Sequence, residues 1–151
     1  AKMIEERALL GGEMSAHIFF KHRYYGYDDA IYSAVRLLDI LCNTEENLAE
    51  IRDSLPNYVN TPEIRFDCPE DRKFAIIEEV RGRLAKGSGY TVNNIDGVRV
   101  ENEHGWWLLR ASNTQAVLVG RCESFDSERL AIIKDALVSQ LRLSGIEPPV
   151  F

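Results

Sequence analysis

The sequence predicts an α+β protein in which an antiparallel sheet of four to five strands packs with two helices, preceded by a segment of helices and loops. Two observations predict this class. Before Pro56 the apolar residues recur at helical spacing, whereas after it short alternating segments separated by turn residues accompany two helical stretches. Hydrophobic residues make up 45% of the 151 residues, which is enough to build a real core.

The first predicted helix spans residues 28–42. Either Asp28 or Asp29 is placed to cap its first turn, because a side-chain carboxylate there can accept from the free backbone N–H groups. The apolar residues at helical spacing are Ile31, Ala34, Val35, Leu38 and Leu41. This periodicity predicts a helix over the whole stretch.

A shorter helix is expected from about residue 45 to 55, with Thr44 as its cap and Pro56 as its end. Its buried stripe is expected to consist of Leu48, Ile51 and Leu55. Residues 57–62 contain asparagines and a second proline and are expected to form a linker. The chain therefore changes character near Pro56.

Beyond the linker, apolar and polar residues alternate over residues 64–68, which predicts a strand. Pro69, Glu70 and Asp71 suit the first turn of a helix, which Lys86 and Gly87 then close. The face of this helix expected to be buried contains Phe74, Ile77, Val80 and Leu84.

Further strands and a last helix complete the predicted sheet domain. The strands are expected at residues 90–95, 98–102, 106–110 and 116–122. The pair Asp96-Gly97 predicts a two-residue hairpin between the first two of them. The last helix, over residues 127–143, has Leu130, Ile133, Leu137 and Leu141 in register. The arrangement that follows is an antiparallel sheet with helices on one face.

Charge and cysteine content exclude several classes of function. A formal net charge of -6 argues against nonspecific nucleic-acid binding, which needs a surplus of Lys and Arg on one face. Cys42, Cys68 and Cys122 are odd in number and lack a CxxC pair, so we expect neither a disulfide framework nor a zinc site, but mostly buried thiols in a reducing cytosol. No apolar run approaches the roughly 20 residues that span a bilayer, and no signal peptide is seen. The start at Ala1 looks like an internal cut.

The segment Gly11 to His17 concentrates a carboxylate, a hydroxyl and an imidazole behind two glycines. If this segment is extended, Glu13, Ser15 and His17 point the same way, since side chains in a strand alternate. Such a mixture of donors and acceptors suits vicinal sugar hydroxyls, and glycines let the backbone approach a ligand closely. The alternative is a glycine turn entering a strand whose polar face is solvated.

The segment Arg110-Ala111-Ser112-Asn113-Thr114 packs a guanidinium, two hydroxyls and a carboxamide into five residues. Arg110 ends an apolar strand, where its fork of donors can match two phosphate oxygens. Ser112, Asn113 and Thr114 add side-chain donors, and a tight turn here would aim backbone N–H groups at an anion. The alternative is a simple hairpin turn, because Ser, Asn and Thr are common turn formers.

Several motifs in chain order resemble the α-D-phosphohexomutase family, in particular its bifunctional phosphomannomutase/phosphoglucomutase members. They are Gly11 to Phe20, Tyr25 to Ala34, Thr61 to Ile64, Asp96 to Val100 and Arg110 to Thr114. The resemblance implies that residues 1–56 are the C-terminal part of the sugar-binding domain 3 of four. It also implies that residues 57–151 are the phosphate-binding domain 4, an antiparallel domain related to the TATA-binding-protein fold.

The resemblance further implies an isomerase of carbohydrate metabolism that interconverts hexose 1-phosphate and hexose 6-phosphate through a 1,6-bisphosphate. Glucose and mannose 1- and 6-phosphates are the implied ligands. Residues that match Glu13 and Ser15 bind the O3 and O4 hydroxyls, and the one that matches His17 lies beside the reacting position as an accessory. Those that match Arg110, Ser112, Asn113 and Thr114 hold the nonreacting phosphate. Together the two segments are expected to face one phosphosugar.

The phosphoserine loop and the magnesium loop of the family have no counterpart in this sequence. The resemblance therefore implies Mg²⁺ and hexose 1,6-bisphosphate for the full-length cytoplasmic phosphoprotein, with the metal ligands and the nucleophile outside this chain. No metal ligand and no catalytic nucleophile are assigned here, and the fragment alone is expected to be inactive. Met14 and the Arg-Ala-Ser-Asn-Thr form argue against a phosphoglucosamine mutase.

Three functional hypotheses remain. The first is the C-terminal portion of a magnesium-dependent phosphohexomutase, whose partners are the remaining domains of the same polypeptide. The second is a non-catalytic phosphosugar-binding module, and the third is an interaction domain that keeps the fold without the site. None of the three involves nucleic acid or a membrane.

Overall fold

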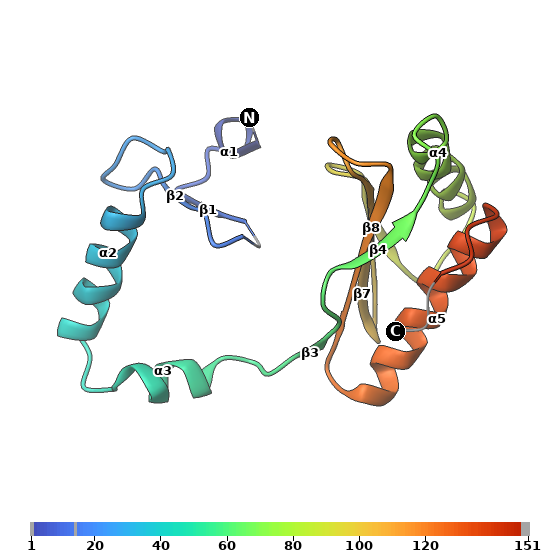
Figure 1. Cartoon of the computed structure of the whole chain (residues 1–151). Helices are drawn as coiled ribbons and strands as arrows, with labels where there is room; N and C mark the ends of the chain where they lie inside the picture. Colours follow the sequence, from blue (N-terminus) through green and yellow to red (C-terminus); the bar gives the residue numbers. More distant parts are fainter. Residues whose placement is uncertain (1, 14, 149–151) are drawn as a thin grey trace. The chain divides into compact units, whose positions relative to one another are not determined.

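The computed structural model describes residues 2–13 and 15–148, and the chain divides into two compact units, Ala1–Pro56 and Asn57–Phe151. The elements of the first unit are α1 (Lys2–Glu5), β1 (Leu10–Gly12), β2 (Ile18–Phe20), α2 (Ala30–Cys42) and α3 (Leu48–Ser54). Those of the second are β3 (Val59–Asn60), β4 (Ile64–Asp67), α4 (Lys73–Leu84), β5 (Thr91–Asn93), β6 (Val98–Asn102), β7 (Gly105–Ala111), β8 (Val117–Ser124) and α5 (Ser127–Leu143). Figure 1 labels most of them.

In the first unit, β1 and β2 form an antiparallel hairpin, and Asp29 caps the N-terminus of α2 because its side chain accepts from the Tyr32 N–H. The predicted helix is confirmed. Its apolar residues, however, are not covered, since Ile31 is 80% exposed and Leu38 is 59% exposed. A two-stranded sheet offers too little surface to bury a four-turn helix.

The cap predicted for α3 is wrong. The helix starts at Leu48, because Asn47 accepts from the Glu50 N–H while the Glu50 carboxylate accepts from the Asn47 N–H. This reciprocal pair satisfies two donors at once, which Thr44 cannot do from its position. The expected stripe is not buried either, since Leu48 is 53% exposed and Leu55 is 60% exposed.

The second unit is built on a six-stranded antiparallel sheet in the order β3-β8-β7-β6-β5, with β4 also pairing with β8. The predicted α+β class is confirmed, with six strands in place of four to five. The additional strand is β3, in the segment expected to be a linker. Val59 and Asn60 pair with Ser124 and Glu123, because β8 extends beyond the end of β4.

Helices α4 and α5 lie on one face of this sheet (Figure 1). The strand residues that face them are buried, as the alternation of β7 shows from Gly105 to Ala111. The core comprises Ile64, Phe66, Cys68, Ile76, Ile77, Val80, Leu84, Val98, Val100, Trp107, Leu109, Ala111, Leu118, Cys122, Ile133, Leu137 and Leu141. Phe74, expected in this core, is 56% exposed, and its place on α4 is taken by Ile76 and Lys73.

The hairpin between β5 and β6 is longer than predicted. The strands pair only as far as Asn93 with Arg99, so four loop residues precede Val98. The Asn93 carboxamide accepts from the Ile95 N–H at 3.0 Å, which turns the chain early. Gly97 has φ +73°, and a Cβ there would lie 2.3 Å from the Leu109 carbonyl oxygen.

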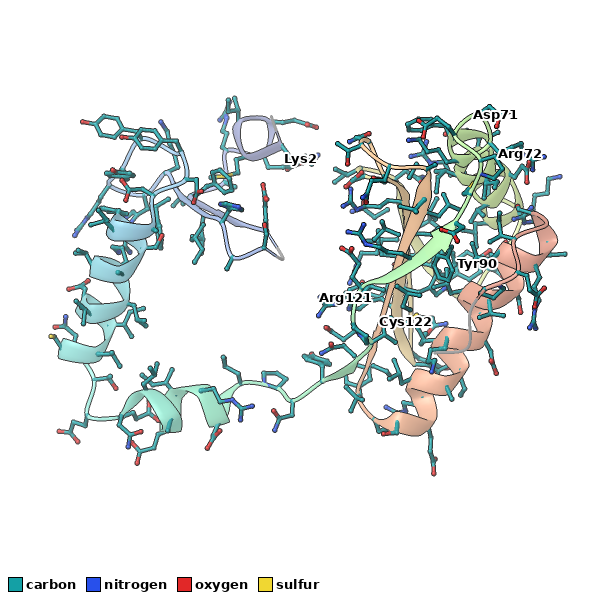
Figure 2. The ribbon with its side chains drawn as sticks, viewed as in Figure 1. Lys2, Asp71, Arg72, Tyr90, Arg121 and Cys122 are labelled. Carbon is teal, nitrogen blue, oxygen red and sulfur yellow. The ribbon has the colours of Figure 1, made fainter. Side chains whose placement is uncertain are left out.

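All three cysteines are free. Cys68 and Cys122, the latter labelled in Figure 2, are buried in the core, and burial raises the pKa of both thiols, that of Cys122 to about 12. Cys42 is exposed, so two of the three thiols are buried, in agreement with the expectation that most of them are. Within the described residues, no helix has both the length and the apolar character that a bilayer crossing requires.

The first prediction concerns Gly97→Ala. We expect the free energy of unfolding of the second unit to fall by about 1–3 kcal/mol, since the new Cβ clashes with the backbone of β7 and the φ angle disfavours any side chain. Urea unfolding followed by the fluorescence of Trp106 and Trp107 measures it, because the chain has only these two tryptophans.

The matched control is Gly82→Ala in α4, where an added Cβ meets nothing within 4 Å. This change should stabilise the unit by roughly 0.5–1 kcal/mol, as expected for a helix interior. Equal stability of the two variants would contradict the constraint at Gly97.

Candidate functional site

The segment from Gly11 to His17 forms the end of the β1–β2 hairpin. Gly12 makes the last strand pair with Ile18, and two backbone hydrogen bonds of 3.0 Å, from Glu13 N–H to His17 O and from Ala16 N–H to Glu13 O, close the loop. The segment is therefore not extended, so the condition under which Glu13, Ser15 and His17 would alternate onto one face is not met. Ala16 has φ 66°, which turns the chain where a strand would continue. Met14 lies outside the described residues.

The polar side chains of this loop are accessible. Glu13 and Ser15 are both exposed, and the Ser15 hydroxyl donates to Glu13 Oε2 at 3.2 Å. This contact leaves carboxylate oxygens and a hydroxyl lone pair open to water or to a ligand. The loop thus presents both residues together although it is not a strand.

His17 is held by a residue that the sequence analysis placed only as a candidate helix cap. Its Nδ1 lies 2.5 Å from Asp28 Oδ2, and the other carboxylate oxygen accepts from the Ile18 N–H at 3.3 Å. The hydrogen bond to Asp28, followed by the negative charge of Asp28, raises the pKa of His17 above its usual value, and Glu13 adds a smaller effect. Because Nδ1 is engaged, Nε2 is the ring nitrogen left to exchange a proton with a ligand.

A tyrosine cluster supports this arrangement from the start of α2. Tyr24 stacks on Tyr32 with 4.0 Å between ring centroids, and its hydroxyl donates to Asp29. This hydrogen bond is the main reason that the pKa of Asp29 is lowered and the pKa of Tyr24 is raised. Asp29 caps the helix, so the neighbouring Asp28 is fixed where it meets His17. Asp28 binds His17, whereas Asp29 caps the helix and binds Tyr24. The spacing of residues in the sequence does not reveal this division.

In the second unit, Arg110 projects from the sheet face that the helices leave uncovered. It is the penultimate residue of β7, between the buried Leu109 and Ala111, and its side chain is 34% exposed. Its Nη1 lies 3.8 Å from Asp96 Oδ2 in the β5–β6 loop. This is its one ionic contact to a side chain among residues 2–13 and 15–148, and it leaves most of the guanidinium donors for a ligand.

The residues after Arg110 form a loop that Ser112 organises from within. The Ser112 side chain is buried, and its Oγ accepts from the N–H groups of Thr114 at 3.3 Å and Gln115 at 3.2 Å. Those two N–H groups, expected to face an anion, are therefore engaged inside the loop. Asn113 and Thr114 are exposed, so their side chains are available to a ligand.

A cavity of about 370 Å³ adjoins this loop. Asn113 and Ala111 line it on the side of the loop, Asp96 and Gly97 on the side of the β5–β6 hairpin, and Phe74 and Arg81 on the side of α4. Of the predicted phosphate-binding residues, Asn113 lines this cavity, whereas Arg110, Ser112 and Thr114 do not. No cluster of three or more His, Cys, Asp or Glu side chains suited to a metal ion occurs within residues 2–13 and 15–148.

The predicted site residues fall in two units. The structure brings Glu13 and Ser15 together in one loop, with His17 at its end, and it brings Arg110, Ser112, Asn113 and Thr114 together at the end of β7. That both groups face one ligand stays a prediction.

Two family models match the chain in succession. The α/β/α domain III of the phosphoglucomutase/phosphomannomutase family matches residues 1–58, and the C-terminal domain of the same family matches residues 63–140.

Individual relatives agree with these matches. The phosphomannomutase/phosphoglucomutase of Pseudomonas aeruginosa is 46% identical over 149 residues, covering 99% of this chain and 32% of that protein. The phosphoglucomutase of Neisseria gonorrhoeae is 42% identical over 118 residues, 78% of this chain and 25% of that protein. A solved structure of a phosphoglucomutase/phosphomannomutase family protein from Burkholderia thailandensis matches with a TM-score of 0.83 and 39% identity, over 99% of this chain and 31% of that one. The chain thus spans a quarter to a third of the length of these relatives.

The second prediction concerns Asp28→Asn, which should lower the pKa of His17 toward its ordinary value near 6.5. In the wild-type chain the raised pKa stabilises the fold fully below the unfolded-state pKa, and this contribution is lost as the pH rises through the folded-state pKa. In the variant the ring should lose its proton at lower pH, which an NMR titration of the His17 ring protons measures.

Asp39→Asn is the control, because it removes the same charge from an exposed position whose side chain contacts Asn43. His104, in the other unit, serves as the internal reference. A His17 titration midpoint that is the same in Asp28→Asn and in the wild-type chain would contradict the pairing.

Proposed function

Because the chain belongs to the phosphoglucomutase/phosphomannomutase family, we propose that it is the C-terminal portion of an enzyme that interconverts hexose 1-phosphates and hexose 6-phosphates. The observation that carries this proposal is the succession of two models of one family along the chain, at residues 1–58 and 63–140. The family inferred from the sequence motifs is confirmed. Activity, substrates and partners of the whole protein remain part of the proposal.

The proposed role of the second unit is to anchor the phosphate that does not react. Arg110 contributes a planar guanidinium, and its ion pair with Asp96 is long, at 3.8 Å. A phosphate dianion offers it shorter, charge-assisted hydrogen bonds. Asn113 and Thr114 would add neutral donors, while the buried Ser112 hydroxyl keeps the loop in shape. Anchoring of this kind fixes the substrate while chemistry proceeds at its other end.

The proposed role of the first unit is to recognise sugar hydroxyls. Glu13 accepts hydrogen bonds, and Ser15 both donates and accepts, so the pair suits two neighbouring hydroxyls such as O3 and O4. Contacts to these hydroxyls do not read the configuration at C2, so glucose and mannose phosphates would both be accepted. His17, held by Asp28, would face the ligand with Nε2 and move a proton there.

The chemistry itself is assigned to other parts of the polypeptide. The described residues contain no cluster suited to Mg²⁺, so we assign no metal ligand to this chain and derive no step through a metal. The phosphoserine that the resemblance implies is likewise placed outside it. The fragment by itself is proposed to bind hexose phosphates, including the 1,6-bisphosphate, without turnover. A cytoplasmic location is proposed on the free state of its cysteines.

Binding can be tested directly on the 151-residue chain labelled with ¹⁵N. Titration with glucose 1-phosphate and glucose 1,6-bisphosphate should shift the amide signals of residues 110–114 and 13–17. Shifts confined to the phosphate segment would remove the sugar-binding role from the first unit. No shift in either segment at millimolar ligand would argue against a phosphosugar site and for an interaction domain.

The third prediction concerns Arg110→Ala in the intact enzyme. Loss of a charge-assisted anchor worth about 1.5–3 kcal/mol per hydrogen bond should lower kcat/KM at least about tenfold for both glucose and mannose phosphates. Arg142→Ala is the control, because Arg142 is exposed on α5 and pairs with Glu147. Equal kcat/KM in Arg110→Ala and the control would refute the role of Arg110.

A further inference from the structure

Within residues 2–13 and 15–148, Lys73 is the one charged residue that is buried, and only 1% of its surface is exposed. It is the first residue of α4, just after Asp71 and Arg72, which Figure 2 labels at the start of that helix. A lysine seldom loses its water in a protein interior unless its amino group finds partners there. The position is also unfavourable for a cation, since the helix dipole repels positive charge at its N-terminus. Local helix energetics therefore do not account for this residue.

The partners of Lys73 lead to the predicted phosphate loop. Its Nζ donates to the backbone carbonyl of Gln115 at 3.1 Å and pairs with Glu70 Oε1 at 2.6 Å. Glu70 is a neighbour on the chain and is 67% exposed, whereas Gln115 lies 42 residues away and directly follows Thr114. Of the two contacts, only the one to Gln115 links α4 to the loop between β7 and β8.

Gln115 is the residue through which the loop is held. Its N–H donates to Ser112 Oγ at 3.2 Å, and its carbonyl also accepts from the Val117 N–H at 2.9 Å. Its side-chain oxygen accepts from Arg65 on β4. Asn113 and Thr114 sit between Ser112 and this anchored residue, so the contacts of Gln115 limit the positions their side chains can take. Loss of a contact at Gln115 would therefore change the positions of the Asn113 and Thr114 side chains.

We infer that Lys73 is a positioning residue for phosphate binding, acting through the Gln115 carbonyl on the loop that carries Asn113 and Thr114. This inference rests on the proposed function of that loop. Lys73 does not touch the ligand. It orders the loop before binding, which reduces the entropy that binding must otherwise remove.

The test compares three variants of the 151-residue chain, titrated with inorganic phosphate and with glucose 1-phosphate. Lys73→Met keeps a long side chain but has no donor. It should shift the amide signals of residues 112–117 in the absence of ligand and weaken phosphate binding about tenfold. Arg72→Met is the matched control, because it removes a charge one residue away from a side chain that is 50% exposed and pairs with Glu79. Lys73→Arg restores a donor and should recover part of the lost affinity.

Each outcome bears on the inference. Binding by Lys73→Met that is as tight as in the Arg72→Met control would overturn it and leave the proposed phosphate site standing. A wild-type chain that does not respond to either ligand at millimolar concentration would overturn the phosphate site and the inference with it. Failure of Lys73→Arg to recover any affinity, although it folds, would show that Lys73 serves the core alone.

A second measurement covers the case in which Lys73→Met does not fold. The ¹H–¹⁵N signal of the Lys73 ammonium group can be followed in the wild-type chain during the phosphate titration. It should shift together with the amides of residues 112–115, while the signal of Lys86, which lies beyond the other end of α4, should not. Loop amides that shift without any change at Lys73 would contradict the coupling.

Discussion

The pairing of β7 with β8 determines where the chemically useful groups of the second unit lie. In this ladder Leu109 faces Gly120 and Ala111 faces Leu118, so both side chains enter the core and Arg110 must emerge on the opposite face. A slip of one residue would bury the guanidinium and expose the leucine. Gly120 helps to exclude that slip, because a Cβ at its position would lie 2.7 Å from the ring of Phe66. Burial of Trp107 and Leu109 on the same strand contributes about 1.5–3 kcal/mol each to the observed register.

The first unit obtains its local order by other means. Its helices α2 and α3 contain no buried residue, so the hairpin loop is not supported by a core of the kind found in the second unit. The geometry at His17 depends instead on the carboxylate of Asp28, the cap at Asp29 and the stacked rings of Tyr24 and Tyr32. Exposed polar interactions of this kind are individually weak, and their strength depends on pH. The burial of apolar side chains does not depend on pH. The sugar-binding and phosphate-binding segments proposed for the two units therefore differ in what keeps each in place.

The sequence predicts the elements in which the apolar pattern repeats many times. It does not predict elements that form only because a distant segment pairs with them. Helix α5 and strands β6, β7 and β8 were found because their apolar residues repeat over enough turns or alternations. Strand β3 was missed because two residues show no alternation, and it exists only because β8 is long enough to pair with it. Phe74 stands at helical spacing with Ile77, Val80 and Leu84, which predicts that it shares their buried face, yet the structure exposes it.

The candidate site shows the same division. The residue types and spacing of Glu13, Ser15 and Arg110 to Thr114 marked polar loops that the structure indeed exposes in large part. The side chains that hold those loops could not be recognised in this way. Asp28 resembles a second helix cap, and Lys73 resembles a solvated residue in a charged turn. Their roles depend on partners 11 and 42 residues away, which only the folded chain brings near.

Helix α4 donates hydrogen bonds to both loops that border the proposed phosphate site, the β7–β8 loop and the β5–β6 loop. Near its start, Lys73 donates to the Gln115 carbonyl, and near its end Arg81 donates to the Gly97 carbonyl at 2.9 Å. Gly97 follows Asp96, the residue that pairs with Arg110. Because Ile76, Ile77 and Val80 fix the helix against the sheet between these two contacts, the loops cannot shift independently of the core. Anion-binding groups held on a rigid element need little reorganisation when a ligand arrives, so the packing of α4 supports recognition although the helix itself supplies no proposed ligand contact.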